Sequence, residues 1–102
     1  MEKPNVLIVD DEPGVRESLR MVLKDRFEVI QASSGTTALE VLERQPVDIM
    51  LLDILMPGID GLEVLERVKL GGGPPQVIML TATKTVKTAV SAMKLGAFDY
   101  VT

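Results

Sequence analysis

Residues 6–13 have the sequence VLIVDDEP, in which four apolar residues are followed by three acidic residues and a proline. A short uninterrupted apolar run is typical of a strand that is buried on both of its faces. Pro13 is tolerated at the first position of a helix, because the N–H that it lacks has no partner there. We therefore expect a buried strand that passes directly into a helix, and the helical spacing of Val15 and Leu19 extends this helix to about Lys24.

The rest of the chain repeats the same alternation between short apolar runs and helical patterns. Further strands are expected at residues 27–30, 47–52, 77–80 and 98–101, and further helices between Gly35 and Pro46, from Gly61 to about Leu70, and between Thr83 and Gly96. Strands that alternate with helices form a parallel sheet with right-handed crossovers and helices on both faces. The sequence therefore predicts a flavodoxin-like α/β fold with three layers, α/β/α, and a five-stranded parallel sheet of order 2-1-3-4-5.

The composition excludes several classes of site. The 102 residues suffice for one domain, and the net charge of -4 argues against direct nucleic-acid binding by this segment. The chain has no cysteine and no histidine, which excludes disulfides, thiolate metal sites, imidazole bases and histidine-bound zinc. No apolar run approaches the length of a membrane span, and the N-terminal MEKPNVLIVDD does not resemble a signal peptide. The expected compartment is the cytoplasm, with no membrane partner.

Three carboxylates are expected to meet at one edge of the predicted sheet. In an open α/β sheet, ligands bind beyond the carboxyl ends of the strands, where the strand order reverses. In the order 2-1-3-4-5 this point lies between the first strand, followed by Asp10 and Asp11, and the third strand, followed by Asp53. Three like charges so close repel one another, and a divalent cation such as Mg²⁺, Mn²⁺ or Ca²⁺ relieves the repulsion. Glu12 could supply a fourth carboxylate.

Purely structural roles are also open for some of these residues. Asp10 and Asp11 precede Pro13 and could do no more than cap the first helix. Thr81 ends the fourth strand and offers a hydroxyl donor, but it could equally cap the helix that follows. Asp53 has no such local role, because it lies inside an apolar run and a separate Pro-Gly pair makes the following turn. An Asp carboxylate beside a metal can instead act as a nucleophile toward a phosphoryl group.

Four motifs give the chain a specific resemblance to a known family. LIVDDE at 7–12, LLDILMPGIDG at 51–61, MLTA at 79–82 and GAFDYVT at 96–102 resemble, in order and spacing, the receiver domain of two-component response regulators. Each motif stands at the end of an expected strand. The resemblance covers essentially all of residues 1–102 and implies a single CheY-like receiver domain.

The resemblance implies roles for the residues at the carboxyl ends of the first and third strands, which we call the acidic edge. Asp53 would be the phospho-acceptor, which takes a phosphoryl group from the histidine of a sensor histidine kinase. Asp11 would bind Mg²⁺ directly, Asp10 would act mainly through a coordinated water, and the backbone carbonyl of Leu55 would be a further metal ligand. Mg²⁺ is therefore the implied cofactor, and Asp53 would share it with these ligands.

Three further residues belong to the site that the resemblance implies. Thr81 would bond a phosphoryl oxygen, and Ala82 would leave room beside it. Tyr100 stands where the family has a rotating aromatic switch residue, which fills the space that Thr81 vacates on phosphorylation. The surface near the fourth helix and fifth strand would then change through a population shift between two existing states.

The family places a lysine, usually followed by proline, and one more helix directly after the fifth strand. Here that lysine would follow Thr102, so we expect residues 1–102 to be a receiver domain that is truncated at its C-terminal end. The missing helix would leave one sheet face partly bare beside the first helix, which favours a homodimer or other self-association. An output domain is expected beyond Thr102, because residues 81–100 look most like receivers that precede ATPase and DNA-binding modules in bacterial transcription activators.

The expected function is a Mg²⁺-dependent phosphorylation switch that regulates a downstream output, and not an enzyme with a separate substrate. A small-molecule phosphatase with an aspartyl-phosphate would need a second acid two residues after the nucleophile, where Leu55 stands. A flavin or nucleotide module is disfavoured, because no G-x-G-x-x-G follows the first strand. A receiver-like interaction module that is not phosphorylated in the truncated form stays open, because the family's lysine is absent from residues 1–102.

Overall fold

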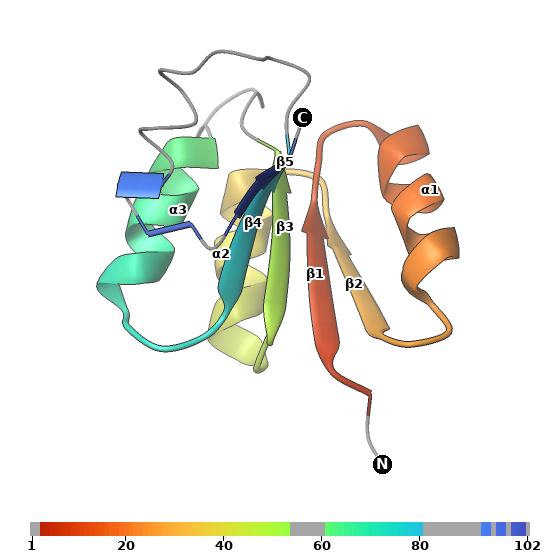
Figure 1. Ribbon diagram of the computed structural model, residues 1–102, viewed down its shortest axis with the longest axis horizontal. Coiled ribbons are helices and arrows are strands. Elements are labelled where there is room, and N and C mark those ends of the chain that lie inside the picture. Colours follow the sequence, from red (N-terminus) through yellow and green to blue (C-terminus); the bar gives the residue numbers. More distant parts are fainter. Residues whose placement is uncertain (1–2, 54–60, 81–92, 95, 98, 102) are drawn as a thin grey trace.

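The computed structural model describes residues 3–53, 61–80, 93–94, 96–97 and 99–101, in which strands and helices alternate. The strands are β1 (Asn5–Val9), β2 (Glu28–Ala32), β3 (Ile49–Asp53), β4 (Gln76–Leu80) and β5 (Asp99–Val101), and the helices are α1 (Pro13–Leu23), α2 (Gly35–Arg44) and α3 (Gly61–Leu70). Neighbouring strands are parallel, and the sheet has the order β2-β1-β3-β4-β5 (Figure 1). The predicted flavodoxin-like sheet and its strand order are therefore confirmed.

Several element boundaries differ slightly from the predicted ones, and hydrogen bonds explain two of the shifts. Phe27 is predicted to begin the second strand, but its N–H donates to the carbonyl of Leu23 at 3.0 Å and closes the last turn of α1. The strand β2 therefore begins one residue later, at Glu28. At the end of β3, pairing with β4 continues to Asp53, whose register partner is Leu80, so this carboxylate belongs to the strand itself.

The two faces of the sheet are covered by different helices. Figure 1 shows α1 on one side of the sheet and α2 and α3 on the other. The α2–α3 side holds the main core, whose side chains are all at most 8% exposed: Leu7, Val9, Ala32, Ala38, Val47, Met50, Leu52, Val64, Leu65, Val68, Val77, Met79 and Ala97. Alternate residues of β1, β3 and β4 enter this core, which fixes the direction in which each strand presents its side chains.

The sheet face beside α1 is covered less completely. The helix α1 has no buried residue, and its Val22 is 78% exposed. On the same side of the sheet, four aliphatic side chains of β3 and β4 are only half-buried: Ile49, Leu51, Ile78 and Leu80. Leu51 and Ile78 are register partners, and Ile49 and Leu80 lie two residues away from them along the same strands. All four side chains are therefore on one face of the sheet, where they form an apolar surface.

Two predicted helix ends are supported by hydrogen bonds. The hydroxyl of Ser34 accepts a bond from the N–H of Thr37 at 3.1 Å and caps the start of α2. Gly96 has a φ of 101°, which favours glycine after a helix, and its N–H donates to the carbonyl of Met93 at 3.1 Å. Met93 and Lys94 are helical, while residues 83–92 and 95 of the predicted fourth helix lie outside the described residues. Within the described ranges, no helix is long and apolar enough to cross a membrane.

Two leucines of α3 give a matched test of the core. Leu65 is fully buried, whereas Leu70 on the same helix is 81% exposed. Replacing Leu65 by Ala leaves a cavity and should lower the free energy of unfolding by about 2–5 kcal/mol. Replacing Leu70 by Ala should change it by less than about 0.5 kcal/mol. Urea unfolding followed by circular dichroism measures both changes, and equal losses would contradict the packing of α3 described above.

Candidate functional site

Three carboxylates meet at the carboxyl ends of β1 and β3. Asp10 and Asp11 follow β1 directly, and Asp53 is the last residue of β3. Val9 and Leu52 are register partners in these neighbouring strands, so the residues that follow them begin at the same edge of the sheet. One oxygen of each carboxylate lies within 4.8 Å of the other two. The structure thus brings together three side chains that are far apart in the sequence.

The three carboxylates differ in exposure. Asp10 is only 7% exposed, Asp53 is half-buried and Asp11 is exposed. Backbone groups hold the buried residue, because the N–H of Asp10 donates to the carbonyl of Ala32 at 3.2 Å and its Oδ1 accepts the N–H of Glu12 at 2.9 Å. A buried carboxylate needs such partners, since burying an unpaired charge is costly. Asp10 is therefore the most buried of the three acids, and two backbone bonds hold it in place.

Asp10 does not occupy the N-cap position of α1, although its side chain bonds the start of this helix. The N-cap residue of α1 is Glu12, and its side chain makes no capping bond. Asp10 instead accepts the N–H of Glu12 itself, one of the N–H groups at the helix start that have no partner within the helix. Glu12 takes part in the site through its backbone, and its carboxylate is not part of the acidic group.

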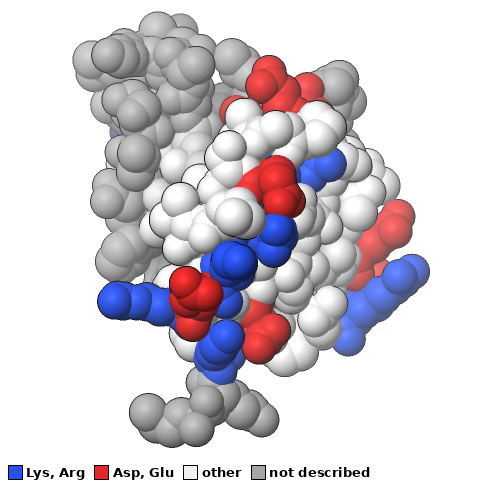
Figure 2. Space-filling view, turned by 90° about the vertical axis from the view of Figure 1, so that its right-hand side faces the viewer, with Lys and Arg blue, Asp and Glu red and all other residues white. Residues whose placement is uncertain are grey.

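The acidic group fits a divalent cation with oxygen ligands. Mg²⁺ binds oxygens at about 2.0–2.1 Å, so two direct ligands lie at most about 4.2 Å apart. Oxygens separated by up to 4.8 Å can therefore supply one or two direct ligands, with the remaining carboxylate bonded through a water molecule. Figure 2 shows acidic side chains at the upper end of the α1 side, the end at which β1 leads into α1 in Figure 1. The negative charge gathered there favours a cation.

Of four other predicted site residues, the structure describes only one, and only by its backbone. Leu55, Thr81 and Ala82 lie outside the described residues, although β3 ends two residues before Leu55 and β4 ends directly before Thr81. The backbone of Tyr100 lies in β5, where its register partner is Met79 of β4. The roles expected of these four residues stay predictions.

Arg16 makes a contact with the site that the sequence analysis did not predict. From α1, its Nη1 donates to the backbone carbonyl of Asp10 at 2.7 Å. The signal in the sequence is a basic residue one helical turn after the N-cap Glu12. The same signal describes any basic residue on an exposed helix, such as Arg20, so the sequence alone does not distinguish the two arginines.

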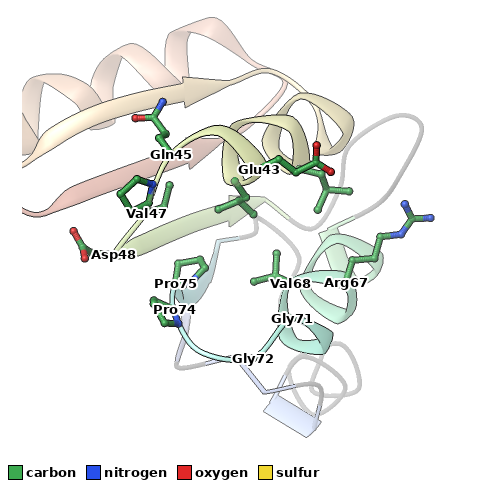
Figure 3. A pocket seen from close by; sticks show the side chains of 13 residues that line it. Glu43, Gln45, Val47, Asp48, Arg67, Val68, Gly71, Gly72, Pro74 and Pro75 are labelled. Atoms are coloured by element: carbon green, nitrogen blue, oxygen red, sulfur yellow. The ribbon is translucent and has the colours of Figure 1, made fainter.

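A cavity of about 500 Å³ lies at the opposite edge of the sheet (Figure 3). Its lining includes Val47 and Asp48, which precede β3, and Pro74 and Pro75, which precede β4. The acidic group lies beyond the other ends of the strands, roughly 15 Å away for a strand of 5 residues. The cavity is therefore separate from the carboxylate site.

Comparison with known protein families shows to which family the chain belongs. The family of response regulator receiver domains matches residues 6–102. The chain belongs to this family. The group formed by Asp10, Asp11 and Asp53 therefore belongs to a receiver domain. The resemblance noted in the four sequence motifs is confirmed.

Relatives and solved structures agree with the receiver-domain assignment. The chain is 41% identical over 104 residues to the putative response regulator NtrX-like of Rickettsia felis, which covers 99% of the chain and 22% of that protein. It is 41% identical over 97 residues to the regulatory protein AtoC of Escherichia coli K12, which covers 94% of the chain and 21% of that protein. The chain thus spans about a fifth of the length of these curated relatives.

A solved receiver-type structure has the same fold. The response regulator protein TrrA from Thermotoga maritima, in complex with Mg(2+)-BeF, superposes with a TM-score of 0.86 at 35% identity. The similarity covers 96% of this chain and 84% of the TrrA chain. The architecture of the present receiver domain is therefore shared with a response regulator whose structure contains a magnesium complex.

Replacement of Asp11 by Asn tests the charge balance of the acidic group. Its oxygen lies within 4.8 Å of two other carboxylates, and each such pair repels by roughly 1 kcal/mol at the dielectric constant of water. D11N should therefore be more stable than the parent chain in EDTA, and should gain less stability from Mg²⁺. Urea unfolding with and without Mg²⁺ measures both effects.

The matched control is Asp25→Asn, which removes an exposed carboxylate outside the acidic group. This variant should gain as much stability from Mg²⁺ as the parent chain does. Equal stabilisation of D11N and the parent chain by Mg²⁺ would contradict a metal site at the acidic edge.

Proposed function

We propose that this receiver domain accepts a phosphoryl group on Asp53 with Mg²⁺ as its cofactor, and that phosphorylation switches a downstream output. The observation that carries the proposal is the meeting of Asp10, Asp11 and Asp53 within 4.8 Å at one edge of the sheet. Membership of the receiver-domain family over residues 6–102 supports the same interpretation. The chemistry needs only oxygen ligands, which suits a chain with no cysteine and no histidine.

Asp53 supplies the nucleophile in this proposal. One of its carboxylate oxygens attacks the phosphorus of a phosphohistidine in line with the leaving nitrogen, so an O–P bond forms as the N–P bond breaks. The electron pair of the broken bond stays on the imidazole of the sensor histidine kinase, which then takes up a proton. Mg²⁺, when bound, neutralises charge on the transferring group. Asp10 and Asp11 hold the ion, and the product leaves added negative charge at the end of β3.

The strand next to β3 supports the roles proposed for Thr81 and Ala82. Leu80, the residue before Thr81, is the register partner of Asp53, so the segment after β4 begins beside the acceptor. In the proposed site, the Thr81 hydroxyl bonds a phosphoryl oxygen and the small Ala82 leaves room beside it. The backbone carbonyl of Leu55 is proposed as a further metal ligand.

Thr81 and Tyr100 are the proposed switch residues. Tyr100 pairs through its backbone with Met79 of β4, which precedes Thr81 by two residues in the sequence. Movement of Thr81 toward the phosphoryl group vacates space that Tyr100 fills, and the surface near β5 changes. A partner that binds only one of these surfaces then shifts the population between the two states.

The receiver domain is proposed to act within a longer signalling protein. Its curated relatives extend far beyond the matched segment, which is 22% of the NtrX-like protein and 21% of AtoC. We propose a sensor histidine kinase as the phosphoryl donor, an output domain beyond Thr102 that regulates transcription, and the cytoplasm as the compartment. In this proposal residues 1–102 are a switch, not an enzyme, and the family's lysine and last helix follow Thr102.

A second proposal is a receiver-like interaction module that is not phosphorylated in the 102-residue form. It rests on the lysine that the family places after β5, since this cation is not among residues 1–102. In a form limited to residues 1–102, that lysine would not be available to a phosphoryl oxygen.

Intact mass measurement after incubation with acetyl phosphate tests the phospho-acceptor. The chain should gain one phosphoryl group in the presence of Mg²⁺, and the gain should be at least about tenfold slower in EDTA. Asp53→Asn should gain none, while the control Asp25→Asn should behave like the parent chain.

The same measurement on a form that extends past Thr102 separates the two proposals. Phosphorylation of the extended form alone would support the interaction module for residues 1–102. An extended form that gains no phosphoryl group, or an Asp53→Asn variant that still gains one, would refute the switch.

The half-buried apolar surface beside α1 is proposed to bind a second copy of the chain. Leu51 and Ile78 are register partners at the centre of this surface. Replacing Ile78 by Lys places a charge there and should shift sedimentation at high protein concentration toward the monomer. Leu70→Lys changes an exposed leucine on the opposite side of the sheet and should leave sedimentation unchanged. A parent chain that sediments as a monomer at every concentration would contradict self-association.

A further inference from the structure

We propose that Arg16 is a positioning residue for the Mg²⁺ site, which it serves by fixing the backbone of Asp10. The proposal rests on the Mg²⁺-dependent function above, because it concerns the geometry of one of the carboxylates assigned to that ion. Arg16 touches neither the ion nor the acceptor in this proposal, and acts only through Asp10.

The first observation is that Asp10 is held at three of its polar atoms. Its N–H donates to the carbonyl of Ala32 at 3.2 Å, and its Oδ1 accepts the N–H of Glu12 at 2.9 Å. Its carbonyl oxygen accepts the Nη1 of Arg16 at 2.7 Å, the shortest of the three bonds. The partners in the first two bonds are backbone groups of Ala32 and Glu12, so Arg16 is the one of these three partners that bonds through its side chain.

The second observation is that Arg16 is itself anchored to the sheet. Its Nε donates to Oε1 of Gln31 at 3.2 Å, and Gln31 lies in β2, where its register partner is Ile8 of β1. The half-buried guanidinium therefore joins α1, the β1–α1 connection and β2. An arginine fork bonded at two different nitrogens has less freedom than a singly bonded one, which suits a positioning role.

The third observation is that the next arginine of the same helix has a different environment. Arg20 pairs with Glu17 of its own helix at 2.6 Å, and this hydrogen bond lowers the pKa of the Glu17 carboxyl. Arg20 makes no hydrogen bond to Asp10 among those of the described residues. The two arginines carry the same charge on the same helix, so Arg20 is a matched control for Arg16.

Electrostatics and positioning predict opposite signs for the loss of Arg16. A guanidinium near the acidic edge repels a cation, so removing only its charge should make Mg²⁺ bind more tightly. Loss of the bond to the Asp10 carbonyl should instead loosen the carboxylate. Contacts to the ligating groups themselves typically change metal affinity by roughly 10–100-fold, so this backbone contact should act at the low end of that range. The sign of the change in Mg²⁺ affinity therefore decides between the two effects, and a role confined to stability predicts no change.

Isothermal titration with Mg²⁺ on the 102-residue chain measures this sign. Arg16→Met should raise the Kd for Mg²⁺ roughly tenfold. Arg16→Lys keeps the charge and one donor, so it should restore part of the lost affinity. Arg20→Met should change the Kd by less than about twofold, as expected for an exposed pair. Thermal unfolding in EDTA, recorded for each variant, establishes that the protein is folded at the temperature of titration.

Gln31→Ala provides a second variant that leaves both arginines in place. It removes the anchor of Arg16 in β2 and should raise the Kd for Mg²⁺ by about threefold, in the same direction as Arg16→Met. An unchanged or lower Kd in Arg16→Met overturns the positioning role, whatever happens to its unfolding temperature. If that variant is unfolded, an unchanged Kd in both Arg16→Lys and Gln31→Ala overturns it.

The titration also separates this proposal from the proposed function. A parent chain that binds Mg²⁺ while Arg16→Met binds it equally well overturns the role of Arg16 alone. A parent chain that binds no Mg²⁺ overturns both the positioning role and the Mg²⁺-dependent switch.

Discussion

The parallel pairing of β1 with β3 is the constraint on which the site depends. Val9 lies beside Leu52, so the ends of two strands that are more than forty residues apart in the sequence coincide at one edge of the sheet. Asp10 and Asp11, which follow β1, therefore meet Asp53, the last residue of β3, at this edge. The apolar core on the α2–α3 side makes this register hard to change, because a slip of one residue would turn every core side chain of a strand to the wrong face.

Much of the fold could be predicted from the sequence, because its main signals are local. The run from Val6 to Val9 and its counterparts identify the strands, and alternation with helices leaves few possible topologies. The meeting of Asp10, Asp11 and Asp53 followed from the strand order and from the place of each acid after its strand. The start of β2 was predicted one residue early, because whether the N–H of Phe27 turns back to Leu23 depends on three-dimensional geometry.

The contact of Arg16 could not be predicted for a related reason. Whether this hydrogen bond forms depends on the direction in which α1 leaves β1, and on the side chain of β2 that lies next to Arg16. Arg16 and Arg20 look alike in the sequence, yet one is bonded to a strand end and the other to its own helix. Sequence patterns report which residues lie on a helix, whereas long-range hydrogen bonds depend on how helices dock. Ala82 and Leu55 were expected from the family motifs, and Thr81 also from its place at the end of the fourth strand. All three lie outside the described residues.

The sparse packing of α1 has a consequence for the energetics of the acidic edge. Because α1 has no buried residue and α3 has four, α1 gains less from burial than α3, and its local opening should cost less free energy than global unfolding. Opening of α1 would also withdraw the guanidinium that bonds the carbonyl of Asp10. Docking of this helix and the arrangement of the acids are therefore thermodynamically linked. A ligand that binds the ordered acids should raise the free energy of local opening of α1, and so slow hydrogen exchange at the amides of this helix.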